Sequence, residues 1–321
     1  MSRSHISSII DKLPFQELGD ILLTFLLFNQ DVALAEQAQS RILKQGRKMT
    51  VDDCISLMNA YMMYDSSEDL WTVFDIIIGR NIRKVERAQI IPILHMFSKA
   101  PFSREKLFQL FVHKIKEAEF GVSDLATITR IYGEIKYSKT DIFKYLDSQL
   151  ANRIFEMSDE DVTNTLIGFI NPDLNLKTDL IDNLETHIQE ILPKISLHNT
   201  TTLLLRYGQL RRGSKIMVES CLKRVHHIYS QEIAKTGEVT PIQLIMTLYS
   251  FNLVGADAKY YFPILKPLVA NKGNLDFDRL NEIYSILKRF EEYDEFLDTL
   301  IEIKYEIEKY NPDGTRKQIF E

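Results

Sequence analysis

The sequence predicts an all-α fold, an α-solenoid of about eight helix–turn–helix repeats of roughly 36 residues each. The first observation behind this prediction is an aromatic residue that returns along the chain at spacings of 36, 36, 35, 37, 38, 42 and 35 residues. A persistent spacing of about 20 to 50 residues is typical of repeat proteins, in which one supersecondary unit is copied and stacked. The eight anchor aromatics are Phe25, Tyr61, Phe97, Tyr132, Phe169, Tyr207, Tyr249 and Tyr284.

The second observation is a set of apolar residues seven, four and three positions before each aromatic, such as Leu18, Ile21 and Leu22 before Phe25. Of these 24 positions 20 are apolar, whereas the 45% apolar content of the chain predicts about 11. The spacing matches one stripe of an α-helix and does not fit a strand, whose side chains alternate with period 2. Each repeat therefore begins with an amphipathic helix. The last two sets are Ile242, Ile245, Met246 and Tyr249, then Phe277, Leu280, Asn281 and Tyr284.

Helix start signals form the third observation. The segments Thr50–Asp53 and Ser158–Asp161 fit the capping box, in which a hydroxyl accepts a hydrogen bond from an unpaired N–H and a carboxylate reaches back. The Thr240-Pro241 pair places a proline in the first turn, where its missing N–H costs no hydrogen bond. Ser66–Asp69 and Ser138–Asp141 predict the starts of second helices. Two helices and two short loops account for about 36 residues.

The repeat predicts one continuous domain over residues 14–310, preceded by a lead-in at 1–13 and followed by a loose C-terminal tail at 311–321. Only two cysteines are present, Cys54 and Cys221, which is too few for a disulfide framework and favours a reducing compartment. No linker rich in proline, glycine or serine divides the chain. We therefore expect a single elongated domain.

The N-terminus leaves two readings open. Arg3, His5 and the nearby serines faintly resemble an organelle presequence, while the alternative is an ordinary helix packed on the first repeat. The longest apolar run, residues 21–28, has eight residues, whereas a membrane span needs about 20. This run predicts a buried first helix.

Glycines flank three anchor aromatics, at Gly133, Gly168 and Gly208. A glycine inside a helix costs about 1 kcal/mol relative to alanine. The compensation that we expect is close approach of a neighbouring helix, which is a packing role.

Signatures of catalysis and of metal binding are missing from the sequence. No Gly-rich phosphate loop, HExxH or GxSxG motif occurs. The neighbours His226 and His227 point about 100° apart on a helix, which disfavours ligation of one ion. The segment Asn171–Asn175 resembles the start of a calcium loop, but Leu176 stands where that loop requires glycine. We therefore expect no catalytic residue, no cofactor and no metal, and predict that the protein is not an enzyme.

The net charge of −6 is unevenly distributed. From residue 206 to residue 227 six basic residues accompany one acid, Glu219, whereas residues 156–190 hold nine acids and one base. This candidate patch is Arg206, Arg211, Arg212, Lys215, Lys223 and Arg224. It has three readings: a solvated face with local ion pairs, a docking patch for an acidic protein partner, or an RNA groove. The C-terminal part is acid-rich, with Glu291, Glu292, Asp294, Glu295 and Asp298.

Two segments, residues 123–133 (SDLATITRIYG) and 201–208 (TTLLLRYG), resemble the first helices of the 37-residue helical repeats of organellar proteins. These are the heptatricopeptide and octotricopeptide classes and the repeat region of FAST-kinase-like proteins. The resemblance covers roughly residues 14–310. It implies a mitochondrial or plastid location and either RNA handling or a structural place in a large organelle complex.

Two functions from different classes follow. The first is a non-catalytic scaffold or accessory subunit of a large mitochondrial assembly, such as a respiratory, ATP-synthase or ribosomal complex, whose partners are other protein subunits. The alternative is an organellar RNA-binding factor that uses the candidate patch. An enzyme whose site no motif reveals is the weakest of the three readings.

Overall fold

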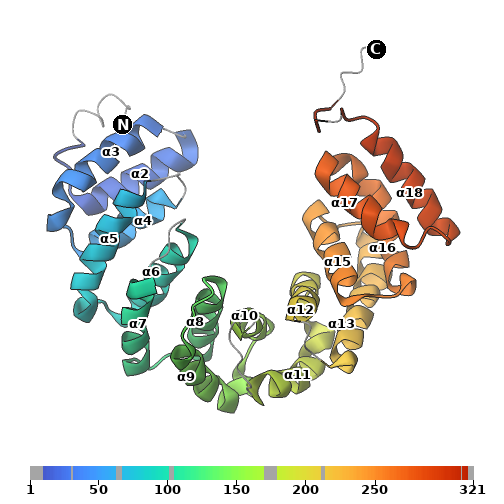
Figure 1. Ribbon diagram of the computed structural model, residues 1–321, viewed down its shortest axis with the longest axis horizontal. Coiled ribbons are helices and arrows are strands. Elements are labelled where there is room, and N and C mark those ends of the chain that lie inside the picture. The colour runs from blue at the N-terminus through green and yellow to red at the C-terminus, as the bar shows by residue number, and fades with distance from the viewer. Residues whose placement is uncertain are drawn as a thin grey trace. The chain divides into compact units, whose positions relative to one another are not determined.

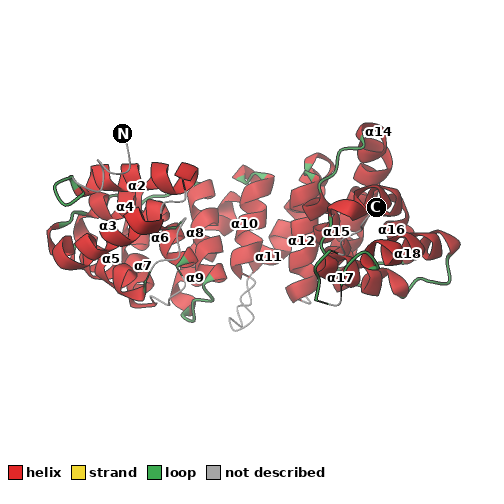
Figure 2. Cartoon of the chain, turned by 90° about the horizontal axis from the view of Figure 1, so that it is seen from above, coloured by secondary structure: helices red, strands yellow, loops and turns green. Residues whose placement is uncertain are grey.

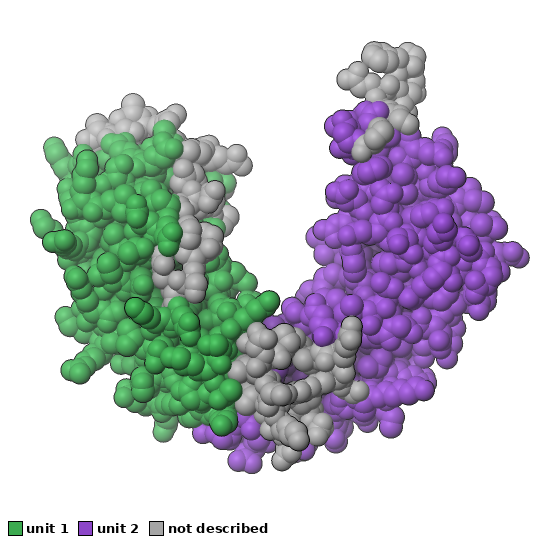
Figure 3. Space-filling view, in the orientation of Figure 1, with its two compact units in different colours: residues 1–146 green, residues 147–321 purple. Residues whose placement is uncertain are grey.

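The computed structural model describes residues 10–29, 32–62, 67–100, 105–169, 179–210, 214–311 and 313–316 (Figure 1). These residues form α-helices joined by short loops (Figure 2), which confirms the all-α prediction. The β-type pairing among them is one isolated bridge between Tyr310 and Arg316. Two compact units divide the chain, Met1–Leu146 and Asp147–Glu321 (Figure 3). The single domain over residues 14–310 stays a prediction.

Unit 1 is built from helices that pack in two layers. In one layer α2 packs on α4, α4 on α6 and α6 on α8, and in the other α3 packs on α5 and α5 on α7. From α2 to α6, each helix therefore contacts the helix two places along the chain. The elements are α2 (Phe15–Asn29), α3 (Val32–Gln45), η1 (Gly46–Lys48), α4 (Val51–Tyr61), α5 (Glu68–Arg80), η2 (Ile82–Lys84), α6 (Arg87–Lys99), α7 (Glu105–Glu117), α8 (Val122–Glu134) and α9 (Thr140–Leu150), which runs past the unit boundary.

Unit 2 has two layers of the same kind, with the short helix α14 inserted in the chain between α13 and α15. One layer joins α10, α12, α15 and α17 in succession, and the other joins α11, α13, α16 and α18. Its elements are η3 (Ala151–Glu156), α10 (Asp159–Phe169), α11 (Asp179–Ile191), η4 (Leu192–Lys194), α12 (Leu197–Leu210), α13 (Lys215–His227), η5 (Ile228–Ile233), α14 (Ala234–Thr236), α15 (Pro241–Val254), α16 (Ala258–Asn271), η6 (Lys272–Asn274), α17 (Phe277–Lys288) and α18 (Asp294–Ile307).

Polar side chains join helices that lie two places apart in the chain. In unit 1 Gln89 Nε2 donates to Asp52 Oδ1 at 2.6 Å, and Lys99 Nζ lies 2.9 Å from Glu134 Oε2. In unit 2 Arg289 Nη1 donates to Asn252 Oδ1 at 2.9 Å. The partners are 37, 35 and 37 residues apart. These separations match the spacing of the anchor aromatics, so equivalent positions of successive helix pairs lie side by side.

Helix starts follow the sequence signals closely. Thr50, Ser158 and Thr240 each accept a hydrogen bond from the backbone N–H three residues on, with side chains reaching back as in a capping box. Helix α5 begins one residue later than the predicted cap at Ser66, because Ser67 is its N-cap. Similarly, α9 begins at Thr140, while Ser138 Oγ donates to Glu105 at 3.2 Å.

Five consecutive anchor aromatics lie in the core. The side chains of Tyr61, Phe97, Tyr132, Phe169 and Tyr207 are buried. The Tyr61 hydroxyl donates to the backbone O of Ala35, and the Tyr132 hydroxyl to that of Phe108, each at 2.8 Å. Both acceptors belong to the second helix of the preceding pair. Burial raises the pKa of Tyr132 well above its usual value, so its hydroxyl stays a donor.

The register predicted for the last two repeats is wrong. Tyr249 and Tyr284 are only half-buried, and Ile242 is 70% exposed. The buried stripe of α15 is Leu244, Thr247, Leu248 and Phe251, and that of α17 is Leu280, Ile283, Ile286 and Leu287.

Extra residues after α13, the second helix of its pair, explain the shift in register. The helical run that starts with α13 continues through the π-helical turn η5 and through α14, from Lys215 to Thr236. These extra turns place the next equivalent core position at Phe251, 44 residues after Tyr207. The following one is Leu287, which restores the spacing of 36. The spacing of the aromatics alone does not reveal this insertion.

The lead-in is attached through a buried arginine of α3. Arg41 Nη2 donates to the backbone O of Leu13 at 2.6 Å, and Nη1 donates to that of Ile10. The guanidinium also lies over the ring of Phe15, 4.4 Å from its centroid. Residues 10–13 are therefore tied to the first helix pair.

We expect Gly208→Ala to lower the free energy of unfolding by about 1 kcal/mol. A Cβ at Gly208 of α12 would lie 2.8 Å from Cγ and Cδ2 of Leu253 in α15, and overpacking outweighs the gain in helix propensity. Gly79→Ala is the matched control, because the nearest atom to its Cβ would be 3.8 Å away. This control should raise stability by about 0.5 kcal/mol. Urea unfolding followed by circular dichroism measures both, and a stabilising Gly208→Ala contradicts the close approach.

We expect Tyr132→Phe to lower the free energy of unfolding by about 1 kcal/mol, because it removes the buried hydrogen bond between the Tyr132 hydroxyl and the backbone O of Phe108. Tyr284→Phe is the control, since its half-buried hydroxyl has no hydrogen-bond partner among the described residues. That change should stay within about 0.5 kcal/mol. Equal losses in the two variants would show that the hydrogen bond of Tyr132 contributes nothing particular.

Candidate functional site

Four of the six residues of the candidate patch lie in the described residues, and they do not form a field of unpaired cations. Arg206 lies in α12, whereas Lys215, Lys223 and Arg224 lie in α13. Arg211 and Arg212 lie outside the described residues.

Arg224 has a structural role. Its Nε and Nη2 donate to the backbone O of Ile195 at 3.3 and 3.2 Å, and its Nη1 lies 3.0 Å from Glu232 Oε1. The side chain is 15% exposed. It thus joins α13 to the turn before α12 and to η5, and it is poorly placed to contact a ligand.

The other described members are divided between local pairs and solvent. Lys223 pairs with Glu219 one turn earlier at 3.0 Å, and this contact raises the pKa of Lys223. Arg206 is half-buried and donates to Gln209 at 2.8 Å. Lys215 is exposed at the start of α13. This geometry agrees best with a solvated face that holds local ion pairs, which are worth little when exposed.

The acid-rich stretch from residue 156 to residue 190 is also used internally, as far as it is described. Asp159 accepts from Asn199 Nδ2 at 2.8 Å, and Asp161 accepts from both N and Oγ of Ser158. Glu185 accepts from the backbone N of Ser214 at 2.9 Å. These carboxylates cap helix starts and join neighbouring helices.

The histidine pair does not build a metal site. His226 is half-buried, with Nδ1 3.4 Å from Ser230 Oγ and its ring against Tyr260, while His227 is exposed. Within the described ranges, no three His, Cys, Asp or Glu side chains lie close enough together to hold a metal ion. The segment 171–175 lies outside the described residues.

A row of exposed apolar side chains follows α18 from the residue before its first turn, and it is not among the candidate residues expected from the sequence. Its residues recur every four positions and are 41%, 46%, 57% and 61% exposed in chain order. Residues four apart lie above one another on a helix, so they form one stripe. We call it the α18 surface: Tyr293, Leu297, Ile301 and Tyr305.

An open groove of about 720 Å³ runs beside this helix, between α16 and α18. Its apolar wall comes from α16, with Phe262, Leu265 and Val269, and its polar rim includes Glu295 and Asp298 of α18. The ring of Phe262 meets that of Tyr293 edge-on at 6.1 Å, so the groove and the α18 surface adjoin.

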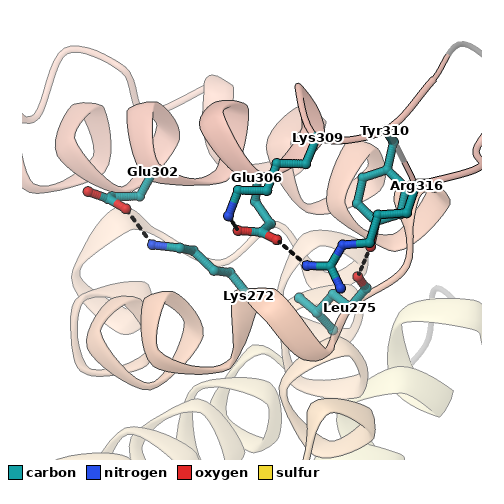
Figure 4. Close-up of polar contacts among 7 residues, drawn as sticks. All are labelled: Lys272, Leu275, Glu302, Glu306, Lys309, Tyr310 and Arg316. Atoms are coloured by element: carbon teal, nitrogen blue, oxygen red, sulfur yellow. Dashed lines mark hydrogen bonds and ion pairs between the residues drawn. The ribbon is translucent and has the colours of Figure 1, made fainter. Parts of the chain in front are cut away.

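Polar contacts hold α18 in place at its C-terminal end (Figure 4). Glu306 is 2% exposed and lies 2.7 Å from Lys309 Nζ and 3.4 Å from Arg316 Nη2. The Tyr310 hydroxyl donates to the backbone O of Leu275 at 3.1 Å, and Lys272 pairs with Glu302. The helix that carries the α18 surface is therefore held in place by these contacts.

The described residues at the start of the predicted C-terminal tail make local hydrogen bonds. Asn311 N donates to Thr315 O at 2.7 Å, and Arg316 reaches back to Glu306. The loose tail over residues 311–321 stays a prediction.

Comparison of the chain with protein-family models gave no match, and comparison with curated proteins gave none. The resemblance to organellar helical repeats therefore stays a prediction. None of the helices within the described part of the chain has the length and apolarity that a membrane crossing requires.

We expect both cysteine thiols to resist alkylation in the folded protein. Cys54 and Cys221 are buried, and burial raises the pKa of each to about 12 from its ordinary value near 9. The reactive thiolate is therefore scarce at neutral and mildly alkaline pH. Iodoacetamide labelling at pH 8, read by intact mass, should be slow in native buffer and rapid in urea. Rapid native labelling of either residue would show that its helix opens.

Proposed function

We propose that this protein is a non-catalytic scaffold or accessory subunit of a large mitochondrial multiprotein assembly, built as an α-solenoid of about eight helix–turn–helix repeats. The partners are other protein subunits. The mitochondrial location rests on the resemblance of residues 123–133 and 201–208 to organellar repeats.

The observation that carries the proposal is the layered packing within each unit, in which α2, α4, α6 and α8 pack in succession in unit 1 and α10, α12, α15 and α17 in unit 2. Hydrogen bonds between residues 35 to 40 apart accompany these contacts, including Asn199 to Asp159. Stacked pairs of this kind offer long surfaces, which such proteins use to bind other macromolecules. This supports a solenoid and a binding function for it.

The use of the polar side chains also supports a scaffold. Several carboxylates and hydroxyls that could act in catalysis instead cap helices or join neighbouring helix pairs. Both thiols are buried. The apolar side chains of the α18 surface, in contrast, face solvent. Contiguous exposed apolar surface with a polar rim is typical of a protein-binding site.

The RNA-binding alternative has weaker support. Phosphate binding depends on exposed basic residues, whereas Arg224 is bound to Ile195 and Glu232, and Lys223 is paired with Glu219. Of the described patch residues, Lys215 is the exposed cation without an ion pair.

Native purification tests the proposal. The endogenous protein, extracted gently from isolated mitochondria and separated by size, should migrate far above the size of a 321-residue chain. The same proteins should co-purify in constant ratio after ribonuclease treatment, because protein contacts hold the assembly. Migration as a single chain would contradict the scaffold function. Collapse of the large species on ribonuclease treatment would favour the RNA-binding alternative, and absence from mitochondria would contradict the location.

A further inference from the structure

We propose that the α18 surface binds an amphipathic helix of a partner protein whose apolar stripe is flanked by lysine or arginine. This inference rests on the proposed scaffold function, because it names the chemistry of one partner segment. The two are tested by different measurements.

The geometry of the α18 surface suits a helix of about three turns. Tyr293 and Tyr305 are twelve residues apart, which is about 18 Å along an α-helix. Leu297 and Ile301 lie between them, half-exposed at 46% and 57%. A helix that binds such a strip contributes apolar residues at a spacing of three and four, the usual pattern of helix recognition.

The charges beside the stripe determine what kind of helix fits. Asp294 and Asp298 each directly follow a residue of the α18 surface, and Glu295 lies on the same flank. All three residues are exposed, and their carboxylates have no ion-pair or hydrogen-bond partner among the described residues. We call them the acidic row. Exposed carboxylates next to an apolar strip favour a partner that brings cations to the rim.

The surface is ordered before a partner binds. The Tyr293 ring packs against Phe262 and Phe296 at 6.1 and 6.0 Å, and Lys309 Nζ lies 5.0 Å from the centre of the Tyr305 ring. The side chains at the two ends of the strip therefore have preferred positions. Little conformational freedom is lost on binding, which favours affinity.

A second copy of the chain is a poorer occupant. Two copies that met by a twofold axis through antiparallel α18 helices would place each flank against the same flank of the other copy. The acidic row of one copy would then face the acidic row of the other. Like charges across an interface disfavour such a contact.

The test uses the full chain and three synthetic peptides of sixteen residues. The peptides share one apolar stripe of leucine and isoleucine, and the flanking positions are all lysine, all glutamine or all glutamate. Fluorescence anisotropy should show saturable binding of the lysine peptide, at least about tenfold tighter than binding of the glutamate peptide. This preference should shrink at high salt because the acidic row is exposed.

Two variants and two controls assign the binding to this surface. Leu297→Gln with Ile301→Gln should weaken binding of the lysine peptide about tenfold or more, and Asp294→Lys with Asp298→Lys should reverse the preference toward the glutamate peptide. The controls are Ile242→Gln on α15, an exposed apolar residue elsewhere, and Asp278→Lys on α17. Both should bind like wild type. Unchanged thermal unfolding shows that each variant is folded, which is expected because the substituted residues are exposed.

The inference would be overturned by equal binding of the three peptides or by the lack of saturable binding. It would also be overturned if the double glutamine variant bound the lysine peptide as tightly as wild type. A concentration-dependent dimer in analytical ultracentrifugation, lost in that variant, would also overturn it and make this surface a contact between copies. These failures leave the scaffold function intact if the native protein still migrates in a large assembly. A wild-type protein that migrates alone fails the scaffold function, whatever the peptides do.

Discussion

The fold depends on one constraint: a helix pair of this size cannot bury its apolar stripe by itself and must pack on the pairs before and after it. In α4 the residues Cys54, Leu57, Met58 and Tyr61 are almost completely buried, since α2 and α6 contact the helix on either side. Helix α18 packs on α16, α17 and η6. Its inner stripe, with Phe296, Leu300 and Ile303, is buried, and its outer stripe is left to solvent. The α18 surface follows from this difference in neighbours.

The helices themselves could be predicted from sequence because their signals are local. Caps at Thr50, Ser158 and Thr240 depend on side chains three residues apart, and the sequence shows these directly. The spacing of the aromatics also predicted five core residues correctly, from Tyr61 to Tyr207, because each lies on the buried side of its helix. Local spacing and repeated surroundings were sufficient there.

The register of α15 and the α18 surface could not be predicted in this way. The extra helical turns of η5 and α14 lengthen the segment before α15, so the spacing that placed the anchor at Tyr249 does not hold there. The residues Ile242 and Phe251 are both apolar, and only packing distinguishes the exposed one from the buried one. Likewise, the four-residue spacing of Tyr293, Leu297, Ile301 and Tyr305 was visible in the sequence. It resembles an ordinary core stripe until the neighbours of α18 are known.

Charge density in the sequence proved a poorer guide to an interface than the partners of each charge. The basic stretch on α12 and α13 has six basic residues against one acid between residues 206 and 227. Arg224, however, is only 15% exposed and donates to the backbone O of Ile195, and Lys223 is paired with Glu219 on the same helix. A cation that already donates to the protein must break those bonds to serve a ligand, and this offsets most of what the new contact contributes. The acids of α18 carry no such cost, because Asp294, Glu295 and Asp298 are hydrated in the unbound protein and adjoin an apolar strip. Burial of Leu297 and Ile301 contributes hydrophobic free energy to the binding of any apolar partner. The acidic row then sets the selectivity between partners, because it favours basic ones and disfavours acidic ones.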